Sequence, residues 1–328
     1  MKGKFVGMNL KSKYLIIILA VIIIKINFSI NVKAEEYSRF NNISIEDGLS
    51  QATVETMMQD SKGYIWLGTN DGLDRYNGYT FKKYSYEKGQ ENSLVNGYIL
   101  DIKEDSEGNI WVATAAGISK IYNNGEKVQN YTSDSESGNL SNDNTATMLI
   151  SSSNKIYVGT AEGINLYDKK TDKFNLIYPE LKEEYVNSLA EDKYGNIWAG
   201  TENGLYKINV VTNAIERFES IDDVNTISEN YIYKVYYDGD KHIWVGTYDN
   251  GFCKLNIENN KVTRYLLTRE DGTIRGAFVK NFLKNHRGNM WICTDEGVVL
   301  FDIDKNIFTW YENKVHDPHS LIDNNTFS

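Results

Sequence analysis

Acidic and amide side chains recur in short glycine-containing stretches of the sequence, and carboxylates are the groups that could act as general acids or bind calcium. The stretches are Asn70-Asp71, Glu202-Asn203, Tyr248-Asp249-Asn250 and Asp295-Glu296. A glycosidase needs two carboxylates at a fixed separation, which a sequence does not specify. Asp, Asn and Gly are also the usual residues of tight turns. We therefore interpret these stretches as turns and assign no catalytic residue.

The cysteines and histidines do not form a metal-binding or nucleophilic pattern. The chain has two cysteines, Cys253 and Cys293, in neighbouring parts of the sequence, and four scattered histidines, His242, His286, His316 and His319. Zinc sites need ligands at close and regular spacing, and neither residue type shows it. We expect free, buried thiols rather than a disulfide, and no metal ion or other cofactor.

The acidic turn stretches belong to a repeated sequence motif. The stretch from Asp60 to Leu73 (DSKGYIWLGTNDGL) has five further copies, whose aromatic landmarks follow one another at intervals of 45, 46, 41, 46 and 47 residues. Such a period is typical of a β-propeller, in which each repeat forms one small sheet. A large aromatic residue at one position of every sheet suits packing between sheets better than exposed sugar stacking. The predicted core residues are Trp66, Trp111, Tyr157, Trp198, Trp244 and Trp291.

The first copy predicts four strands joined by tight turns. Asp60-Ser-Lys-Gly63, Asn70-Asp-Gly72 and Asn77-Gly78 are the turn sequences. Gly68 is expected to keep side-chain bulk low where strands crowd, and Ala113 and Cys293 depart from this pattern in other copies. The predicted strands, from innermost to outermost, are Val54 to Gln59, Tyr64 to Thr69, Leu73 to Tyr76 and Thr80 to Ser85.

A second landmark predicts how each unit begins, because an apolar residue precedes the innermost strand by five positions. The pairs are Leu49 and Val54, Leu94 and Ile99, Leu140 and Thr145, Ile227 and Ile232, Ile274 and Val279, and Leu321 and Thr326. The unit at Val186 has no clear landmark and a short entry loop. We therefore predict an all-β propeller with six complete four-stranded blades and the start of a seventh at Thr326, in a chain truncated within a seven-bladed ring. Tyr37 to Ser44 is expected to be an outermost strand that would join the chain ends.

Composition and the N-terminus indicate export. The 328-residue chain has a formal charge of −10, and without the six lysines of residues 1–34 the remainder carries −16. An acidic domain without a basic stripe is a poor nucleic-acid binder. Lysines, the apolar run Leu15 to Ile24 and Val32-Lys33-Ala34 predict that residues 1–34 are a signal peptide or an uncleaved signal anchor. Either places residues 35–328 outside the cytoplasm.

The motifs resemble one known family. Phe40 to Ser50 (FNNISIEDGLS), the repeated D-x-x-G-x-I-W-x-G-T-x-x-G-L units and the entry motif Leu94-Val-Asn96 are similar to the two-component regulator propeller family over about residues 37 to 328. The resemblance implies the extracellular sensor of a membrane-spanning signalling protein, whose output is often a histidine kinase and sometimes a diguanylate cyclase. The sequence has no kinase motif or nucleotide-binding loop, so we expect no enzymatic activity from this chain.

Candidate ligand-binding residues lie in the loops that would surround one mouth of a propeller channel. Asn, Tyr and Arg side chains there suit a neutral or acidic oligosaccharide, although they are also ordinary loop residues. The candidates are Asn96, Tyr98, Asn142, Asn144, Asn230, Tyr231 and Arg275.

The main functional hypothesis is an extracytoplasmic sensor module of a two-component-type signalling protein that binds a glycan or another small molecule. It would be attached to the cell membrane through the N-terminal segment or a missing C-terminal part, and the full-length protein would form a homodimer. The alternatives are the sensor of a membrane diguanylate cyclase, a secreted propeller lyase or glycosidase, and a protein-binding scaffold.

Overall fold

The computed structural model describes residues 40–134, 139–269, 271–274 and 278–327. These residues form 24 β-strands and two short 3-10 helices, η1 (Ile45–Asp47) and η2 (Pro179–Leu181). In this part of the chain, no helix has the length and apolar character needed to cross a membrane. The predicted targeting segment, residues 1–34, lies outside the described residues.

The strands form six antiparallel sheets, each with four strands in sequence order. Blade 1 contains β1 (Val54–Gln59), β2 (Ile65–Thr69), β3 (Gly72–Tyr76) and β4 (Phe81–Tyr84); blade 2 contains β5 (Ile99–Glu104), β6 (Ile110–Thr114), β7 (Gly117–Ile121) and β8 (Val128–Tyr131); blade 3 contains β9 (Thr145–Ile150), β10 (Ile156–Thr160), β11 (Gly163–Asp168) and β12 (Lys173–Ile177). Blade 4 contains β13 (Val186–Glu191), β14 (Ile197–Thr201), β15 (Gly204–Ile208) and β16 (Ile215–Phe218); blade 5 contains β17 (Ile232–Tyr237), β18 (His242–Thr247), β19 (Phe252–Asn256) and β20 (Val262–Tyr265); blade 6 contains β21 (Val279–Lys284), β22 (Met290–Thr294), β23 (Gly297–Asp302) and β24 (Ile307–Tyr311).

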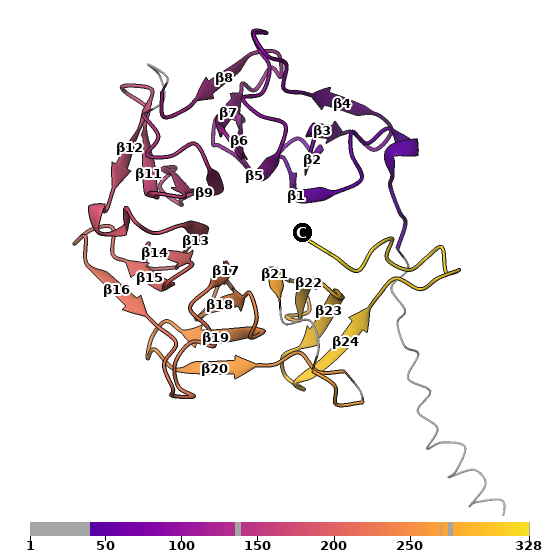
Figure 1. Cartoon of the computed structure of the whole chain (residues 1–328), viewed down its shortest axis with the longest axis vertical. Helices are drawn as coiled ribbons and strands as arrows, with labels where there is room; N and C mark the ends of the chain where they lie inside the picture. Colours follow the sequence, from indigo (N-terminus) through magenta and orange to yellow (C-terminus); the bar gives the residue numbers. More distant parts are fainter. Residues whose placement is uncertain (1–39, 135–138, 270, 275–277, 328) are drawn as a thin grey trace, which may run out of the picture. The chain divides into compact units, whose positions relative to one another are not determined.

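The six blades are arranged in a ring around a central axis, with the first strand of each blade innermost (Figure 1). Each innermost strand contacts the next one from β1 through β21. The predicted all-β propeller with six complete blades is confirmed. The first-unit strand bounds differ from the prediction by one residue at most at either end.

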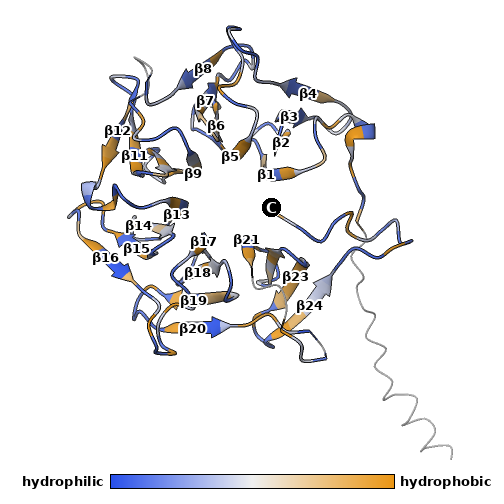
Figure 2. Ribbon diagram, viewed as in Figure 1, coloured by the Kyte–Doolittle hydropathy of each residue, from blue (hydrophilic) through white to orange (hydrophobic). Residues whose placement is uncertain are grey.

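The core lies between neighbouring blades. Hydrophobic residues follow the strands of every blade in Figure 2, and each of the five hydrophobic clusters joins two blades. Five of the six predicted core aromatics are at most 2% exposed: Trp66, Trp111, Tyr157, Trp198 and Trp244. The sixth, Trp291, is partly exposed because no further blade covers its sheet. The five buried aromatics therefore pack between blades, whereas Trp291 belongs to none of these clusters.

A carboxylate, an indole and a cation form a repeated group in four blades. Asp60 Oδ2 accepts a hydrogen bond of 2.8 Å from the indole nitrogen of Trp66, and Arg75, directly across the sheet, lies over the indole ring at 5.7 Å. The same group forms in the other three blades from Asp105, Trp111 and Lys120, from Asp192, Trp198 and Lys207, and from Asp238, Trp244 and Lys254. Blades 3 and 6 instead carry Ser151, Tyr157 and Leu166, and Asn285, Trp291 and Leu300. The carboxylate and the cation are thus replaced together.

Residue size is matched across each blade boundary. A Cβ added to Gly200 would lie 2.6 Å from Ile232 Cγ2 of the next blade, and Gly68, Gly159 and Gly246 face Ile99, Val186 and Val279 in the same way. Where Ala113 and Cys293 replace the glycine, the facing residue is threonine, Thr145 or Thr326. The hydroxyl of Thr145 accepts a bond from Thr114 N (3.1 Å) and lies 2.7 Å from Thr114 O. The two departures noted in the sequence are therefore compensated.

Blades 6 and 1 do not pack together as the other neighbours do, and the segment after β24 runs between them (Figure 1). Its Thr326 repeats the role of Thr145, because its N–H donates to Thr294 O (2.9 Å) and its hydroxyl accepts from Thr294 N (3.1 Å). This contact lies where the sequence predicts the start of a seventh unit, but residues 321–327 form no strand. The bordering faces are open: Met57 is 51% exposed, whereas Ile102 at the same position of blade 2 is 1% exposed.

Three expectations about the chain ends and entry loops need correction. The described part of the predicted N-terminal strand, residues 40–44, forms no strand, and Phe40 N instead donates to His319 O (3.0 Å). The unit at Val186 does have its apolar landmark, Leu181, which is 1% exposed in η2. Ile274 is 60% exposed because the loop before β21 folds back in a bridge to Thr268, and Leu267 is buried instead, at 1% exposed.

Candidate ligand site around the ring axis

The residue just before each innermost strand lies at one end of the ring axis, and we call this set the axial rim. In blades 2 to 6 the rim consists of Tyr98, Asn144, Tyr185, Tyr231 and Phe278. All five are at least partly exposed, and Tyr98 is 40% exposed. Four of them are aromatic, so the rim presents rings whose outer surfaces reach solvent.

Three of the predicted ligand residues belong to this rim, namely Tyr98, Asn144 and Tyr231. They are also connected to other side chains, since the Tyr185 hydroxyl donates to Asn144 Oδ1 (3.2 Å) and the Tyr231 hydroxyl donates to Glu202 Oε1 (3.2 Å). These bonds fix the side chains while leaving ring surface exposed.

The other predicted residues have different roles or lie outside the described residues. Asn96 Oδ1 accepts a bond from Tyr98 N, and Asn142 Oδ1 accepts one from Asn144 N, both at 2.8 Å. Asn230 Oδ1 accepts a 2.6 Å bond from Ser220 N and so ties its loop to the end of the outermost strand before it. These amides hold the loops that carry the rim. Arg275 lies outside the described residues.

An aromatic group on blades 5 and 6 extends the rim. Tyr231 and Tyr248 have ring centroids 5.2 Å apart, Tyr248 and Phe278 4.8 Å, and Tyr233 and Phe278 4.7 Å. Tyr248 comes from the turn between β18 and β19 and is 49% exposed. The ligand residues predicted from the sequence did not include Tyr185, Tyr233, Tyr248 and Phe278. Aligning the residue before each innermost strand would have found Tyr185 and Phe278.

Opposite charges lie beside the rim on β1 and β21. The hydroxyl of Tyr98 and the amide of Asn70 donate to the Glu55 carboxylate. Burial raises the pKa of Glu55, and the charge of Lys280 with these two hydrogen bonds lowers it by less. Burial also lowers the pKa of Lys280, whose ammonium donates to Asn325 Oδ1 and lies over the rings of Phe327 and Phe278.

The rim tyrosines are held in their neutral form. Burial, followed by the charge of Glu202, raises the pKa of Tyr231 to about 12. Burial and the charge of Glu55 raise the pKa of Tyr233 to about 12. At neutral pH both hydroxyls therefore keep their proton, and Tyr231 donates its proton to Glu202.

The turns that contain the acids listed from the sequence are held by hydrogen bonds between backbone groups and a threonine hydroxyl. Thr69 Oγ1 accepts from Asp71 N (3.1 Å) and donates to Gly72 O (2.8 Å), and Thr201 and Thr294 make the same pair of bonds in their blades. Among the residues that the structure describes, no group of three His, Cys, Asp or Glu side chains could hold a metal ion. The turns predicted at these stretches therefore form.

The two cysteines form no disulfide. Cys253 is buried and Cys293 is partly exposed. Burial raises the pKa of each thiol to about 11, so both stay protonated at neutral pH. The expectation of free thiols is confirmed, with Cys293 less enclosed than expected.

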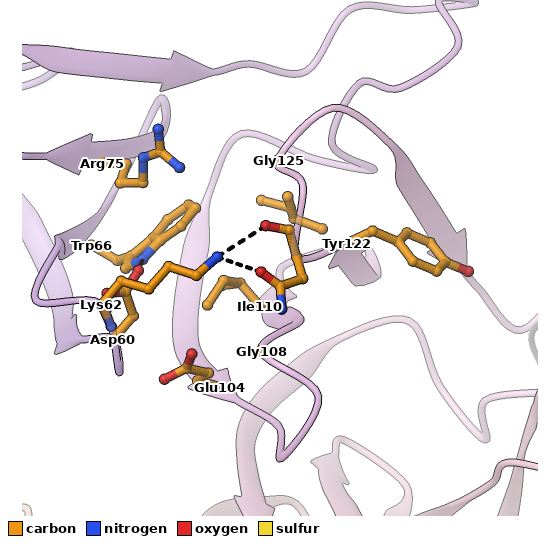
Figure 3. Close-up of a pocket in the computed structure, with 11 residues that line it drawn as sticks. Asp60, Lys62, Trp66, Arg75, Glu104, Gly108, Ile110, Tyr122 and Gly125 are labelled. Atoms are coloured by element: carbon orange, nitrogen blue, oxygen red, sulfur yellow. Dashed lines mark hydrogen bonds between the residues drawn. The ribbon is translucent and has the colours of Figure 1, made fainter.

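Two cavities lie away from the rim, between the outer parts of neighbouring blades. In the first, between blades 1 and 2, the ammonium of Lys62 points at Asn123 and donates to its carbonyl oxygen (3.2 Å) beside the Asp60–Trp66 pair (Figure 3). The second has a volume of about 190 Å³ and is lined by Lys120, Tyr167 and the Glu107–Lys169 ion pair. Both are lined by side chains that connect blades. We place the candidate site at the rim because its aromatic rings are partly exposed around the ring axis.

Comparison with known proteins agrees with this architecture. The model of the two component regulator propeller family matches residues 48–71, 93–116, 180–203 and 226–249. A segment of 67 residues is 37% identical to histidine kinase P4 of Formosa agariphila and covers 20% of this chain and 5% of that protein. The four family matches fall on the blades that contain the carboxylate–indole–cation group.

Solved structures show the same fold at low sequence identity. The extracellular domain of a hybrid two component system of B. thetaiotaomicron superposes with a TM-score of 0.74 at 20% identity, over 88% of this chain and 38% of that chain. Streptogramin B lyase gives a TM-score of 0.57 at 16% identity, over 75% of this chain and 78% of that chain. This chain thus spans a small part of the kinase and about two fifths of the two-component sensor. The family matches confirm the resemblance: the entry loop and first two strands of four of the six blades match the two component regulator propeller model.

Proposed function

We propose that this propeller is the extracytoplasmic ligand-sensing module of a membrane-attached signalling protein of the two-component type. The repeat family and the fold shared with the extracellular domain of a hybrid two component system support this proposal. A histidine kinase is the proposed output, because the matched relative is one. The chain itself acts by binding, and membrane attachment comes from residues 1–34 or from the rest of a longer protein.

We further propose that the ligand is an oligosaccharide bound at the axial rim. The observation that carries this proposal is the exposed aromatic group of Tyr231, Tyr248 and Phe278, beside Tyr98 and Asn144. Tyrosine supplies a rigid apolar ring for the C–H face of a sugar and a hydroxyl for its polar edge. Binding would change the orientation of the propeller relative to the next part of the longer protein, and this change would be transmitted to the output domain.

The proposal is tested by glycan-array binding and titration calorimetry on the full chain. Tyr98→Ala and Tyr231→Ala should each weaken binding by about tenfold, since loss of a stacking ring and a hydrogen bond costs about 1–3 kcal/mol. Tyr79→Ala is the matched control, because Tyr79 is 91% exposed in the turn before β4. Binding that survives both rim substitutions would exclude the rim as the site. Binding lost equally in Tyr79→Ala would exclude a specific role for the rim.

A further inference from the structure

A buried lysine, Lys120 on β7, lines the cavity between blades 2 and 3. The side chain is 8% exposed, and the cavity has a volume of about 190 Å³. The ammonium of Lys120 lies over the rings of Trp111 (4.8 Å), Tyr122 (4.9 Å) and Tyr167 (5.8 Å). Within the described residues it makes no hydrogen bond and no ion pair. The rings attract the positive charge but do not neutralise it.

Lys120 is more withdrawn from water than the cations at the same position of other blades. Arg75, Lys207 and Lys254 lie over the indoles of blades 1, 4 and 5 at 5.4–5.7 Å, and all three are only partly buried. An ammonium that is removed from water without a bonded counter-charge is destabilising, and a bound anion would offset that effect.

The carboxylates near Lys120 are already bonded to other groups. Asp105 accepts a bond of 2.8 Å from the indole nitrogen of its own blade and two bonds of 2.9 Å from backbone N–H groups. The charge of Asp172 acts on Lys120, but the Asp172 oxygens accept three bonds of 2.6–2.7 Å from other side chains. Glu107 forms an ion pair with Lys169. None of these acids is therefore free to pair with Lys120.

The charges around the cavity balance in number but not in bonding. The charged side chains that line the cavity, together with Asp172, are Lys120, Lys155, Lys169, Asp105, Glu107 and Asp172. All three carboxylates have bonded partners, whereas the ammonium groups of Lys120 and Lys155 have none in the part of the chain that the structure describes. Two donors of positive charge thus remain available to a ligand.

A glutamate connects neighbouring blades at two other boundaries. Glu104, the last residue of β5, accepts bonds from the backbone N–H (2.6 Å) and the hydroxyl (2.7 Å) of Ser61. Glu191, the last residue of β13, accepts the same two bonds from Ser152, at 2.6 and 2.9 Å. The serine lies in the first turn of one blade, and the glutamate belongs to the next blade.

This glutamate is missing between blades 2 and 3. The turn of blade 2 has the corresponding serine, Ser106, but the last residue of β9 is Ile150. Ser106 N instead donates a long bond of 3.4 Å to Asn154 Oδ1. Asn154 lines the cavity, as do Asp105 and Glu107 on either side of Ser106. The boundary therefore keeps the serine turn and lacks the carboxylate that it binds elsewhere.

The cavity has room for a small ligand. At the boundary between blades 1 and 2, Lys62 crosses to Asn123, and the corresponding cavity has a volume of only about 10 Å³ (Figure 3). Glu107 occupies the position of Lys62 in blade 2 and pairs with Lys169 instead. The volume of about 190 Å³ that remains is below the roughly 300–1,000 Å³ of sites for drug-sized ligands. It suits a small ion rather than a sugar chain.

We propose that this cavity binds a compact oxyanion, such as sulfate, phosphate or a short carboxylate, between the Lys120 ammonium and the Ser106 turn. The anion takes the place of the glutamate that blade 3 lacks, and it connects blades 2 and 3. Charge-assisted hydrogen bonds from an ammonium and a backbone N–H suit any oxyanion with two accessible oxygens. This site is separate from the axial rim and does not depend on the function proposed for the rim.

The proposal is tested by thermal unfolding of the full chain in sodium sulfate and in sodium chloride at equal ionic strength. The unfolding midpoint of the wild type should rise saturably with sulfate, because a ligand that binds the native state stabilises it. Lys120→Met should raise the apparent Kd for sulfate by about tenfold or more, as expected for the loss of one charge-assisted contact. Lys120→Arg should keep the response, because it keeps the charge and Arg75 occupies the same position of blade 1.

Lys207→Met is the matched control, because it removes an ammonium from the indole of blade 4 in the same way. It should respond to sulfate like the wild type. No saturable rise in the wild type, the same rise in Lys120→Met, or an equal loss in Lys207→Met would overturn the proposal.

A second variant tests the site without removing Lys120. Ile150→Glu supplies the missing carboxylate from within the chain, as Glu104 and Glu191 do, and should also weaken sulfate binding by about tenfold. An unchanged sulfate affinity in this variant would contradict the proposal even if Lys120→Met does not fold. Titration calorimetry with sulfate, phosphate and acetate distinguishes the sources, since tighter acetate binding identifies a carboxylate and tighter sulfate or phosphate binding a tetrahedral anion.

Discussion

The size match between Gly200 and Ile232 allows a sharp test of how the blades fit together. The added Cβ of Gly200→Ala would lie 2.6 Å from Ile232 Cγ2 and 2.8 Å from Val235 Cγ2, well inside contact distance. Such overpacking lowers the free energy of unfolding by about 1–3 kcal/mol, whereas replacing a glycine within a strand raises it by about 0.5–1 kcal/mol. We expect Gly200→Ala to lower the free energy of unfolding by about 1–2 kcal/mol.

The second substitution of the test is Ile232→Thr, which creates the pairing seen between Ala113 and Thr145. By itself, Ile232→Thr should lower the free energy of unfolding by about 1–2 kcal/mol, because Ile232 is fully buried and the change removes buried apolar surface. In the double variant the smaller hydroxyl can turn toward Thr201, as Thr145 does toward Thr114. The double variant should therefore be more stable than the sum of the two single effects by about 1 kcal/mol.

The assay is urea unfolding of the full chain, followed by circular dichroism and by tryptophan fluorescence. The reverse pair, Ala113→Gly with Thr145→Ile, is the control and should show the same sign of coupling. Additive effects within about 0.5 kcal/mol in both cycles would refute the size-matching argument. An unchanged stability of Gly200→Ala would show that the neighbouring blade can move aside at no cost.

Three further predictions concern the core, pH dependence and the open faces. Trp198→Ala should lower the free energy of unfolding by about 3–5 kcal/mol, because the side chain is fully buried and its indole donates to Asp192 Oδ2 (2.9 Å); an unchanged urea midpoint would contradict the packing role. Glu55 has a raised pKa in the folded state, so protonated Glu55 contributes fully to the free energy of unfolding below its ordinary pKa of 4.5, and this contribution is lost as pH rises through the folded-state pKa. Glu55→Gln should therefore become more stable relative to the wild type as pH increases. A stability difference between the two proteins that does not change with pH would contradict this prediction. Met57 and Leu283 are 51% and 63% exposed on the open faces, so the full chain should self-associate in size-exclusion chromatography, and replacing both with Lys should shift it toward the monomer; a wild type that is already monomeric contradicts this expectation.

Much of the fold was predictable because its determinants are local. The alternation of apolar residues, the glycine turns and the recurring aromatic fix each strand within one repeat, so the blades agree with the sequence almost to the residue. The aromatic core was predictable for the same reason, since one position recurs in every unit. The Asp60–Trp66 bond was not foreseen, although both residues are six positions apart in each matched repeat.

The candidate site depended on contacts that the repeat does not encode. Asn96 and Tyr98 lie in one loop, yet Asn96 Oδ1 accepts a backbone hydrogen bond while the ring of Tyr98 is exposed. Similarly, Ile274 occupies the landmark position but is exposed, because its loop folds back and lets Leu267 enter the core.

By itself the sequence determined the all-β class, six four-stranded units and the buried aromatics, because strand periodicity and turn chemistry act over a few residues. Only the tertiary structure decided which side chains meet around the axis, such as Tyr248 of blade 5 and Phe278 of blade 6. It also decided why threonine faces Ala113 and Cys293, since that fit arises between blades whose residues are about thirty positions apart. The physical reason is that inter-blade packing depends on how the sheets are placed against one another, and no single repeat specifies that placement.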